Sequence, residues 1–256
     1  MVVGGLMAVV ILSAQVASGV ILNGDHEPTA THYPDLRTRQ LTLGNLQVNV
    51  KTSRNPKRPP RTIELRFPNT VANWGTGPLE VRPEHDTNAR TTTAYQRLFT
   101  HDSAGNPSLA DEQPVGNFVF HKQHHHWHFE GFALYELYYD ADGGLGNLVM
   151  DGAKTTVCIR DNSTPESGTS GLVHFGWGGY HNCSKTSVQG LTVGYGDTYT
   201  AGTQGQSFDI TAVSFPACLW LVSTANPDNL LHESLNDNNT TAIRFQVTAD
   251  YQITGC

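Results

Sequence analysis

Short segments in which polar and apolar residues alternate recur along the chain, and this pattern most constrains what it can fold into. Alternation with a period of two places apolar side chains on one face of a β-strand, whereas an amphipathic helix needs a period near 3.6. Helical periodicity is weak almost everywhere. The expected strands cover residues 41–50, 62–67, 155–161, 206–213, 218–225 and 240–253. The sequence predicts a mainly β protein, an immunoglobulin-like β-sandwich with long irregular loops and little helix.

The middle of the chain divides into two unlike parts. Residues 81–117 show no clear alternation and are predicted to form loops. Residues 115–138 are rich in aromatic and β-branched side chains, which favour strands. The length of 256 residues suits one large domain.

The charge balance argues against a nucleic-acid partner. The formal net charge is −7, with 16 Lys and Arg residues and no long basic run that could follow a phosphate backbone. An acidic protein attracts cationic substrates instead, although salt weakens this attraction.

The first 20 residues combine an apolar run with a zone of small residues, as in a secretory signal peptide. They lack a basic beginning, and the alternative is an N-terminal core strand. The expectation is a signal over residues 1–20, a single domain over residues 21–256, and a secreted protein. No other apolar stretch is long enough to span a bilayer, so no stable membrane insertion is expected after signal removal.

The cysteine count fits an exported chain. Four cysteines without a C-x-x-C pair predict two disulfides rather than a thiolate metal site. Three pairings are open, and pairing between sequence neighbours, Cys158 with Cys183 and Cys218 with Cys256, is preferred.

Five of the twelve histidines fall within eight residues, in the segment HKQHHHWH. On a strand, His124, His126 and His128 would project to one face, while His125 and Trp127 would face the other. Three neighbouring imidazoles repel one another when protonated, and a divalent transition metal resolves that conflict. Copper and zinc both suit imidazole ligands, and the local pattern does not choose between them. His121 is predicted to be a fourth ligand, a group behind the ligands or a solvent-facing residue.

Together with four other segments, the histidine segment resembles the catalytic domain of the lysyl oxidases, which are copper amine oxidases acting on peptidyl lysine. The other segments are LRFPNTVANWGTGPLEVRP (residues 65–83), GAKTTVCIRD (152–161), NCSKTSVQGLTVGYGDTY (182–199) and NPDNLLHESLNDNN (226–239). They occur in the family's order, and the likeness runs from about Tyr33 to Cys256. The chain is therefore similar to a minimal version of that domain.

The resemblance implies an enzyme that converts primary amines, peptidyl lysine first among them, to aldehydes with release of hydrogen peroxide and ammonia. It assigns copper to His124, His126 and His128. It also implies a cofactor, lysine tyrosylquinone, formed from Lys154 and Tyr199. Molecular oxygen would be the second substrate. Taken alone, Lys154 would be interpreted as a loop lysine and Tyr199 as a core aromatic residue.

The catalytic base is less well defined by the motifs. Asp197 lies two residues before Tyr199 and would share its strand face, and Glu130 follows the histidines. Asp197 is the preferred candidate, with a structural hydrogen-bond acceptor as the alternative for both.

The resemblance also implies calcium, which some family members bind through oxygen ligands. The matching residues are Asp35, Leu36 through its backbone oxygen, Glu233, Asn238 and Asn239. Leu235 stands where the family has an aspartate, so calcium and a capped hairpin turn are both retained as interpretations.

Two other classes of function compete with the amine oxidase. A mononuclear zinc hydrolase could use the same histidines with a nearby base, and would give Lys154 and Tyr199 no role. An immunoglobulin-like adhesion module could bind copper or a partner without turnover. A quinone in copper-loaded protein would separate the oxidase from both.

Overall fold

The chain is built almost entirely from β-strands. The computed structural model describes residues 30–55, 57, 61–84, 89–122, 125–152, 156–163 and 179–256. Within these ranges the single helical element is the 3-10 turn η1 (Leu43–Asn45), and no helix is long and apolar enough to cross a membrane. The prediction of a mainly β fold is confirmed.

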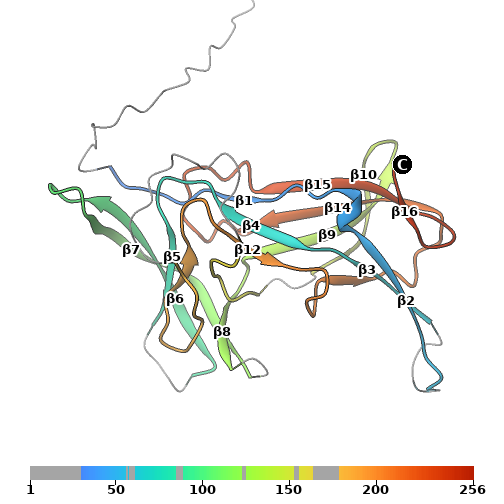
Figure 1. Cartoon of the computed structure of the whole chain (residues 1–256), viewed down its shortest axis with the longest axis horizontal. Coiled ribbons are helices and arrows are strands. Elements are labelled where there is room, and N and C mark those ends of the chain that lie inside the picture. Colours follow the sequence, from blue (N-terminus) through green and yellow to red (C-terminus); the bar gives the residue numbers. More distant parts are fainter. Residues whose placement is uncertain are drawn as a thin grey trace, which may run out of the picture.

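The strands form four antiparallel sheets in an elongated molecule (Figure 1). The first sheet has the strand order β1 (Leu36–Thr38), β4 (Asn69–Asn73) and β12 (Gly196–Tyr199), and the second has the order β10 (Gly144–Asp151), β9 (Ala133–Ala141), β14 (Ala217–Ala225), β15 (Thr240–Val247) and β16 (Ile253–Thr254). The third sheet has the order β11 (Gln189–Leu191), β5 (Leu79–Pro83), β6 (Thr91–His101), β7 (Pro107–His121) and β8 (His126–Phe129). The fourth has the order β13 (Ser207–Asp209), β3 (Arg61–Arg66) and β2 (Gln47–Thr52).

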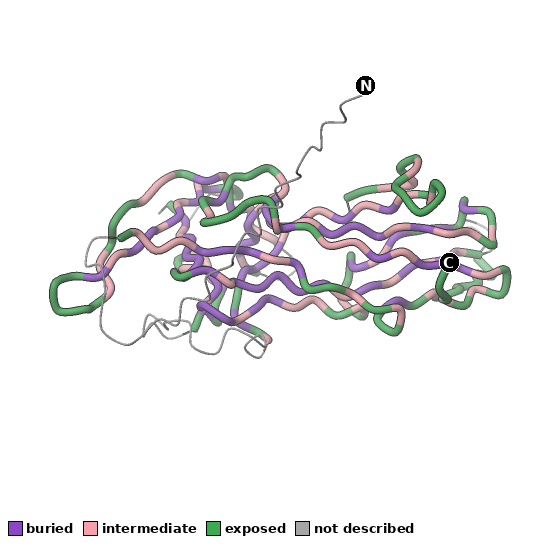
Figure 2. The backbone as a smooth tube through the Cα atoms, turned by 90° about the horizontal axis from the view of Figure 1, so that it is seen from above, coloured by how far each residue is buried: buried purple, intermediate pink, exposed green. Residues whose placement is uncertain are grey.

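Two hydrophobic cores hold the sheets together. One lies between the β3 sheet and the β9–β14–β15 sheet and includes Leu65, Tyr135 and Phe245. The other joins the β4 sheet to the β5–β8 sheet and includes Phe118 and Trp127. Buried stretches run along the strands of both halves, while the exposed residues concentrate in the connecting loops (Figure 2). Burial of these apolar faces is the main stabilising contribution to such a sandwich.

Both disulfides join sequence neighbours. Cys158 pairs with Cys183 and Cys218 pairs with Cys256, with Cα–Cα distances of 5.8 and 5.9 Å. The preferred pairing is therefore confirmed. The first bridge lies at the second core, and the second fastens the C-terminal end of the chain to β14.

The prediction of loops over residues 81–117 is wrong, because β6 and β7 form a long hairpin there. Charged side chains on these strands pair across the sheet, as Arg97 does with Glu112 at 3.2 Å, and this makes the alternation hard to recognise. Pro114 is tolerated in β7 because it lies beyond the reach of β8, where β7 is an edge strand.

Two other strand predictions need correction. Residues 43–45 of the expected strand 41–50 form η1, and the strand begins only at Gln47. In the segment 155–161, Val157 forms an isolated bridge with Phe129 instead of a strand. The predicted signal over residues 1–20 lies outside the described residues.

Candidate functional site

The β7–β8 hairpin presents histidines on one face and core aromatics on the other. Its register places Phe118 opposite Phe129 and Phe120 opposite Trp127, and both pairs make edge-to-face ring contacts. The alternate positions therefore turn away from this core, and His126 lies opposite His121. Burial of the aromatic face thus fixes where the imidazoles point.

The structure brings two of the three predicted ligands together. The Nε2 atoms of His126 and His128 are 2.9 Å apart, and the His121 ring stacks on His128 with a centroid distance of 4.9 Å. His124 lies outside the described residues. Within the described ranges no three His, Cys, Asp or Glu side chains converge as a metal-binding group.

The prediction that His125 shares a strand face with Trp127 is wrong. β8 begins only at His126, and His125 occupies the preceding turn with φ of 56°. Its backbone N–H donates to the His121 carbonyl at 2.9 Å, which closes the turn. The strand geometry for the histidine run therefore holds only from His126 onward.

The far edge of β8 is fixed by segments from later in the chain. Trp127 N–H donates to the Cys183 carbonyl at 3.0 Å, and Phe129 and Val157 exchange backbone hydrogen bonds. The buried Gln189 side chain donates to the Trp127 carbonyl at 3.0 Å and accepts from Ile159 N–H at 2.9 Å. One amide thus links the histidine strand to the segment that follows Lys154.

Tyr199 closes the other side of the site. It ends β12, opposite Asn69 of β4, and its hydroxyl donates to the Cys158 carbonyl at 3.2 Å. Burial raises the pKa of the Tyr199 phenol well above its ordinary value, and the nearby charge of Asp197 raises it further. The tyrosine is therefore held in its neutral form.

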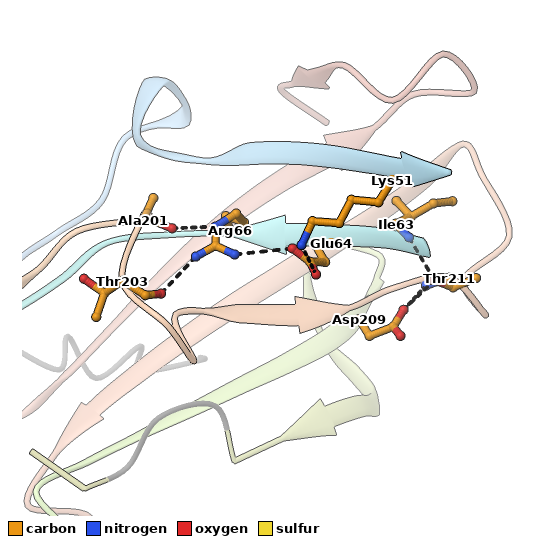
Figure 3. A network of polar contacts seen from close by, with 8 residues as sticks. All are labelled: Lys51, Ile63, Glu64, Arg66, Ala201, Thr203, Asp209 and Thr211. Atoms are coloured by element: carbon orange, nitrogen blue, oxygen red, sulfur yellow. Dashed lines mark hydrogen bonds and ion pairs between the residues drawn. The ribbon is translucent and has the colours of Figure 1, made fainter. Parts of the chain in front are cut away.

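Arg66 holds the turn that follows Tyr199. Its guanidinium donates to the carbonyls of Ala201 and Thr203 at 2.5 and 2.9 Å and also pairs with Glu64 (Figure 3). Because Thr203 lines the pocket next to Tyr199, the clamp from β3 defines one wall of the site.

A pocket of about 460 Å³ joins these parts. Its lining residues are His125, His126, His128, Cys158, Arg160, His181, Asn182, Cys183, Ser184, Tyr199 and Thr203. A polar cavity of this size can admit a side chain or a small amine.

Asp197 does not line the pocket but lies buried beside it. Its carboxylate accepts from the Asn162 amide at 2.6 Å, and Asn162 in turn accepts from Thr198 N–H. Glu130 is also absent from the lining. Lys154 lies outside the described residues.

Sequence reasoning missed Arg160 and His181 as pocket residues. Arg160 lies in the expected strand 155–161, but neither residue belongs to a set of metal ligands. Each is two residues from a cysteine of the Cys158–Cys183 bridge, so the preferred disulfide pairing was the signal that could have placed them together.

The predicted calcium residues form one cluster between β1 and the 226–239 loop. Glu233 accepts from Leu36 N–H at 2.5 Å and from the Asn239 amide at 2.8 Å, and Asn238 donates to Asp35 at 2.9 Å. Leu36 thus contributes its N–H to the cluster. Asp35 also pairs with Arg37.

Carboxylate and amide groups are concentrated in this cluster. Burial raises the pKa of Glu233 to about 7, and the charge of Asp35 adds to this effect. Among the described residues, the buried side-chain oxygens of Asn238 and Asn239 have no hydrogen-bond partner. Carboxylate oxygens beside amide oxygens that have no hydrogen-bond partner are the kind of ligand that suits calcium. Leu235 is 50% exposed and takes no part.

The fold and the site define a class of protein. It is a β-sandwich protein in which the histidines of one strand and a partly buried tyrosine line the same pocket. The chain belongs to the lysyl oxidase family, because the family model named lysyl oxidase matches residues 80–256, more than half of its length.

Individual relatives agree with this assignment. The chain is 28% identical over 156 residues to protein-lysine 6-oxidase of Sus scrofa, a match that covers 59% of this chain and 56% of the relative. The human protein-lysine 6-oxidase is also 28% identical over 156 residues, with 34% of the relative covered. Lysyl oxidase homolog 3A of Danio rerio is 32% identical over 149 residues, which are 57% of this chain and 18% of the relative. The chain thus spans 56% or less of the length of these relatives.

Proposed function

We propose that the chain is a copper- and quinone-dependent amine oxidase of the protein-lysine 6-oxidase type. The net reaction is R–CH2–NH2 + O2 + H2O → R–CHO + NH3 + H2O2, with peptidyl lysine as the first candidate substrate. The observation that carries the proposal is that Tyr199, His126 and His128 line the same pocket. Family membership and the names of the relatives support it.

The histidine pair fits copper. Two nitrogen ligands at about 2.05 Å from one ion, at right angles to each other, would be about 2.9 Å apart. The Nε2 atoms of His126 and His128 have this separation. His124 would complete the imidazole set assigned by the sequence. Ligands of this type suit copper as well as zinc, and family membership favours copper.

The surroundings of Tyr199 fit the proposed cofactor. Thr156 contacts His128 Nδ1 at 3.5 Å, and the carbonyl of Cys158 accepts the Tyr199 hydroxyl. The segment that begins two residues after Lys154 therefore touches both sides of the site. Thr156, two residues after the lysine assigned to the cofactor by the motif, is thus the first described residue of this segment to reach the site.

The bound cofactor would supply an electron sink for oxidation of the amine. The chain's own residues would hold and orient the reacting groups. Arg66 fixes the wall beside Tyr199, and Gln189 fixes the distance between the histidine strand and the Cys158 segment. Asp197 was the preferred base, but since it lies outside the pocket lining, we propose that it acts through Tyr199 as a positioning residue.

We further propose that the Glu233 cluster binds calcium and that the protein is secreted. Calcium would replace the present amide contacts of Asp35 and Glu233 and satisfy the oxygens of Asn238 and Asn239. Two disulfides fit an oxidising compartment, in agreement with a signal peptide over residues 1–20.

Peptide mapping by mass spectrometry tests the proposed oxidase. The protein would be expressed with copper and air and treated with or without phenylhydrazine. A cross-linked peptide pair joining Lys154 to Tyr199, shifted in mass by the hydrazine, is expected. Tyr199→Phe should abolish the cross-link, while the matched control Tyr195→Phe should retain it.

Separate, unmodified Lys154 and Tyr199 peptides from copper-loaded protein would overturn the cofactor. The chain would then be assigned to the copper-binding adhesion module. A zinc-loaded protein that hydrolyses substrates without oxygen uptake would support the mononuclear hydrolase instead.

A further inference from the structure

The charge of the pocket is unusual for an enzyme whose substrate is an amine. Among the described lining residues, Arg160 is the one that is permanently charged, and the others are histidines, small polar residues, the disulfide and Tyr199. The described lining residues include no carboxylate. An alkyl amine is protonated at neutral pH, because its pKa lies near 10.4, so it would approach this wall as a cation.

Arg160 is presented from a rigid backbone. On one side, Ile159 donates to Gln189 and its carbonyl accepts from Gly190 N–H at 3.1 Å. On the other, Asp161 N–H donates to the Tyr180 carbonyl at 2.8 Å. The buried Asp161 carboxylate also accepts from the backbone N–H groups of Tyr180 and Thr192, at 3.1 and 2.9 Å. The residues that flank Arg160 are therefore pinned.

The Arg160 side chain itself is exposed. No hydrogen bond or ion pair joins its guanidinium to any described residue, unlike the paired Arg66, Arg82 and Arg97. The positive charge of Arg160 lowers the pKa of Tyr199 and so partly opposes the rise in that pKa caused by Asp197. A guanidinium fork held in this way matches a carboxylate, with which it can form two parallel hydrogen bonds.

We propose that Arg160 is a specificity-determining residue that binds a carboxylate of the substrate next to the amine to be oxidised. The preferred substrates are then lysine residues flanked by glutamate or aspartate. Such a substrate brings the negative charge that offsets the repulsion between its ammonium group and Arg160. The inference rests on the proposed amine oxidase and names the substrate class for the same pocket.

Three capped peptides test this inference, each with one lysine flanked by glutamate, glutamine or arginine. Peroxide and aldehyde release give kcat/KM for each, and fluorescence anisotropy under argon gives the Kd without turnover. We expect a preference of roughly five- to tenfold for the glutamate peptide over the arginine peptide, which decreases with added salt. Arg160→Gln should remove the preference and Arg160→Glu should reverse it. Lys57→Gln, in an exposed loop, is the charge-matched control and should retain it.

The outcomes separate the two proposals. If all three peptides are oxidised equally well by the wild-type protein, the oxidase stands and the role of Arg160 is overturned. If binding depends on Arg160 and no peptide is oxidised, the carboxylate site stands and the oxidase is overturned. Reversal by Arg160→Glu is a result that a merely structural role would not produce.

Discussion

At the scale of single residues, backbone position gives identical side chains different roles. His125, His126 and His128 are neighbours in sequence, yet His125 lies in a turn with positive φ, while the other two share one face of β8. The shared face of His126 and His128 was predicted correctly because alternation along a strand is a local property. It could not predict the turn, which depends on the hydrogen bond from His125 to His121.

This difference predicts which histidine substitutions affect copper. His126→Ala or His128→Ala should weaken copper binding by more than about 100-fold, since changes to groups behind metal ligands already cost 10- to 100-fold. His125→Asn is the control, because asparagine tolerates positive φ, and its copper content should match the wild type. Metal analysis after dialysis against a competing chelator measures the difference. Equal loss of copper from the His125 and His126 variants would contradict the assignment.

Two of the proposed cofactor and pocket residues show the limit of sequence reasoning. Tyr199 could be found from its motif, and the structure gives it a partner in Cys158. Arg160 could not, because its role depends on contacts that pin Ile159 and Asp161 from β11 and from the segments beside it. Such contacts join positions far apart in the chain and leave no local pattern.

At the scale of strands, polar pairs across the sheets explain which elements could be predicted. β14 and β15 alternate clearly and were predicted, whereas β6 and β7 were mistaken for loops. Residues on the outer face of β6 and β7 form ion pairs, so their polar positions do not follow a simple pattern. Pairing between neighbouring strands, and not the composition of each strand, determines where the polar residues of β6 and β7 lie.

The polar link across β9, β14 and β15 predicts a specific acid sensitivity. Asp140 accepts from Trp220 at 2.9 Å and pairs with Arg244 at 2.7 Å, which lowers the pKa of Asp140 to about 2. A carboxyl group with a depressed pKa stabilises the fold above its ordinary pKa. That stabilisation is lost as the pH falls from about 4 to about 2.

Urea unfolding at pH 5 and at pH 2 measures this contribution. Asp140→Asn should lower the urea midpoint of unfolding at pH 5. It should also reduce the difference between the midpoints measured at pH 5 and at pH 2. Asp142→Asn, in the exposed turn after β9, is the control and should behave like the wild type. An unchanged pH dependence in the Asp140 variant would show that the link does not contribute.

At the scale of the whole molecule, two disulfides of similar loop length have different surroundings. Cys158–Cys183 lines the pocket and adjoins the histidine strand through the Cys183 carbonyl, whereas Cys218–Cys256 lies away from the pocket lining. The pairing followed from sequence proximity, but this difference in position did not.

Removal of each bridge should therefore have separable effects. Both double serine variants should lose roughly 3–4 kcal/mol of unfolding free energy, as expected for loops of 25 and 38 residues. Only Cys158→Ser with Cys183→Ser should also weaken copper binding in the folded state. Copper titration at low temperature, with circular dichroism to confirm folding, checks this. Equal copper affinity in both variants would contradict the coupling.

The Glu233 cluster predicts that calcium ties the N-terminal strand to the 226–239 loop. Calcium at 100 times its dissociation constant should stabilise the protein by about 2.7 kcal/mol, seen as a rise in Tm. Glu233→Gln should abolish the rise. Leu235→Asp, which introduces the aspartate that the family has at this position, should increase the rise in Tm. Asp237→Asn should leave the rise unchanged. A rise that survives Glu233→Gln would place calcium elsewhere.

The order of the strands along the chain determines which parts of the site can form first during biosynthesis. The β7–β8 hairpin is local and closes through His121 and His125, so a growing polypeptide can form it early. Tyr199 is synthesised much later, and its strand must then find β4, made long before. A newly made chain thus acquires its imidazoles well ahead of its tyrosine. Under the proposed function, metal capture can precede completion of folding, whereas self-processing of Tyr199 must wait until β12 has docked on β4.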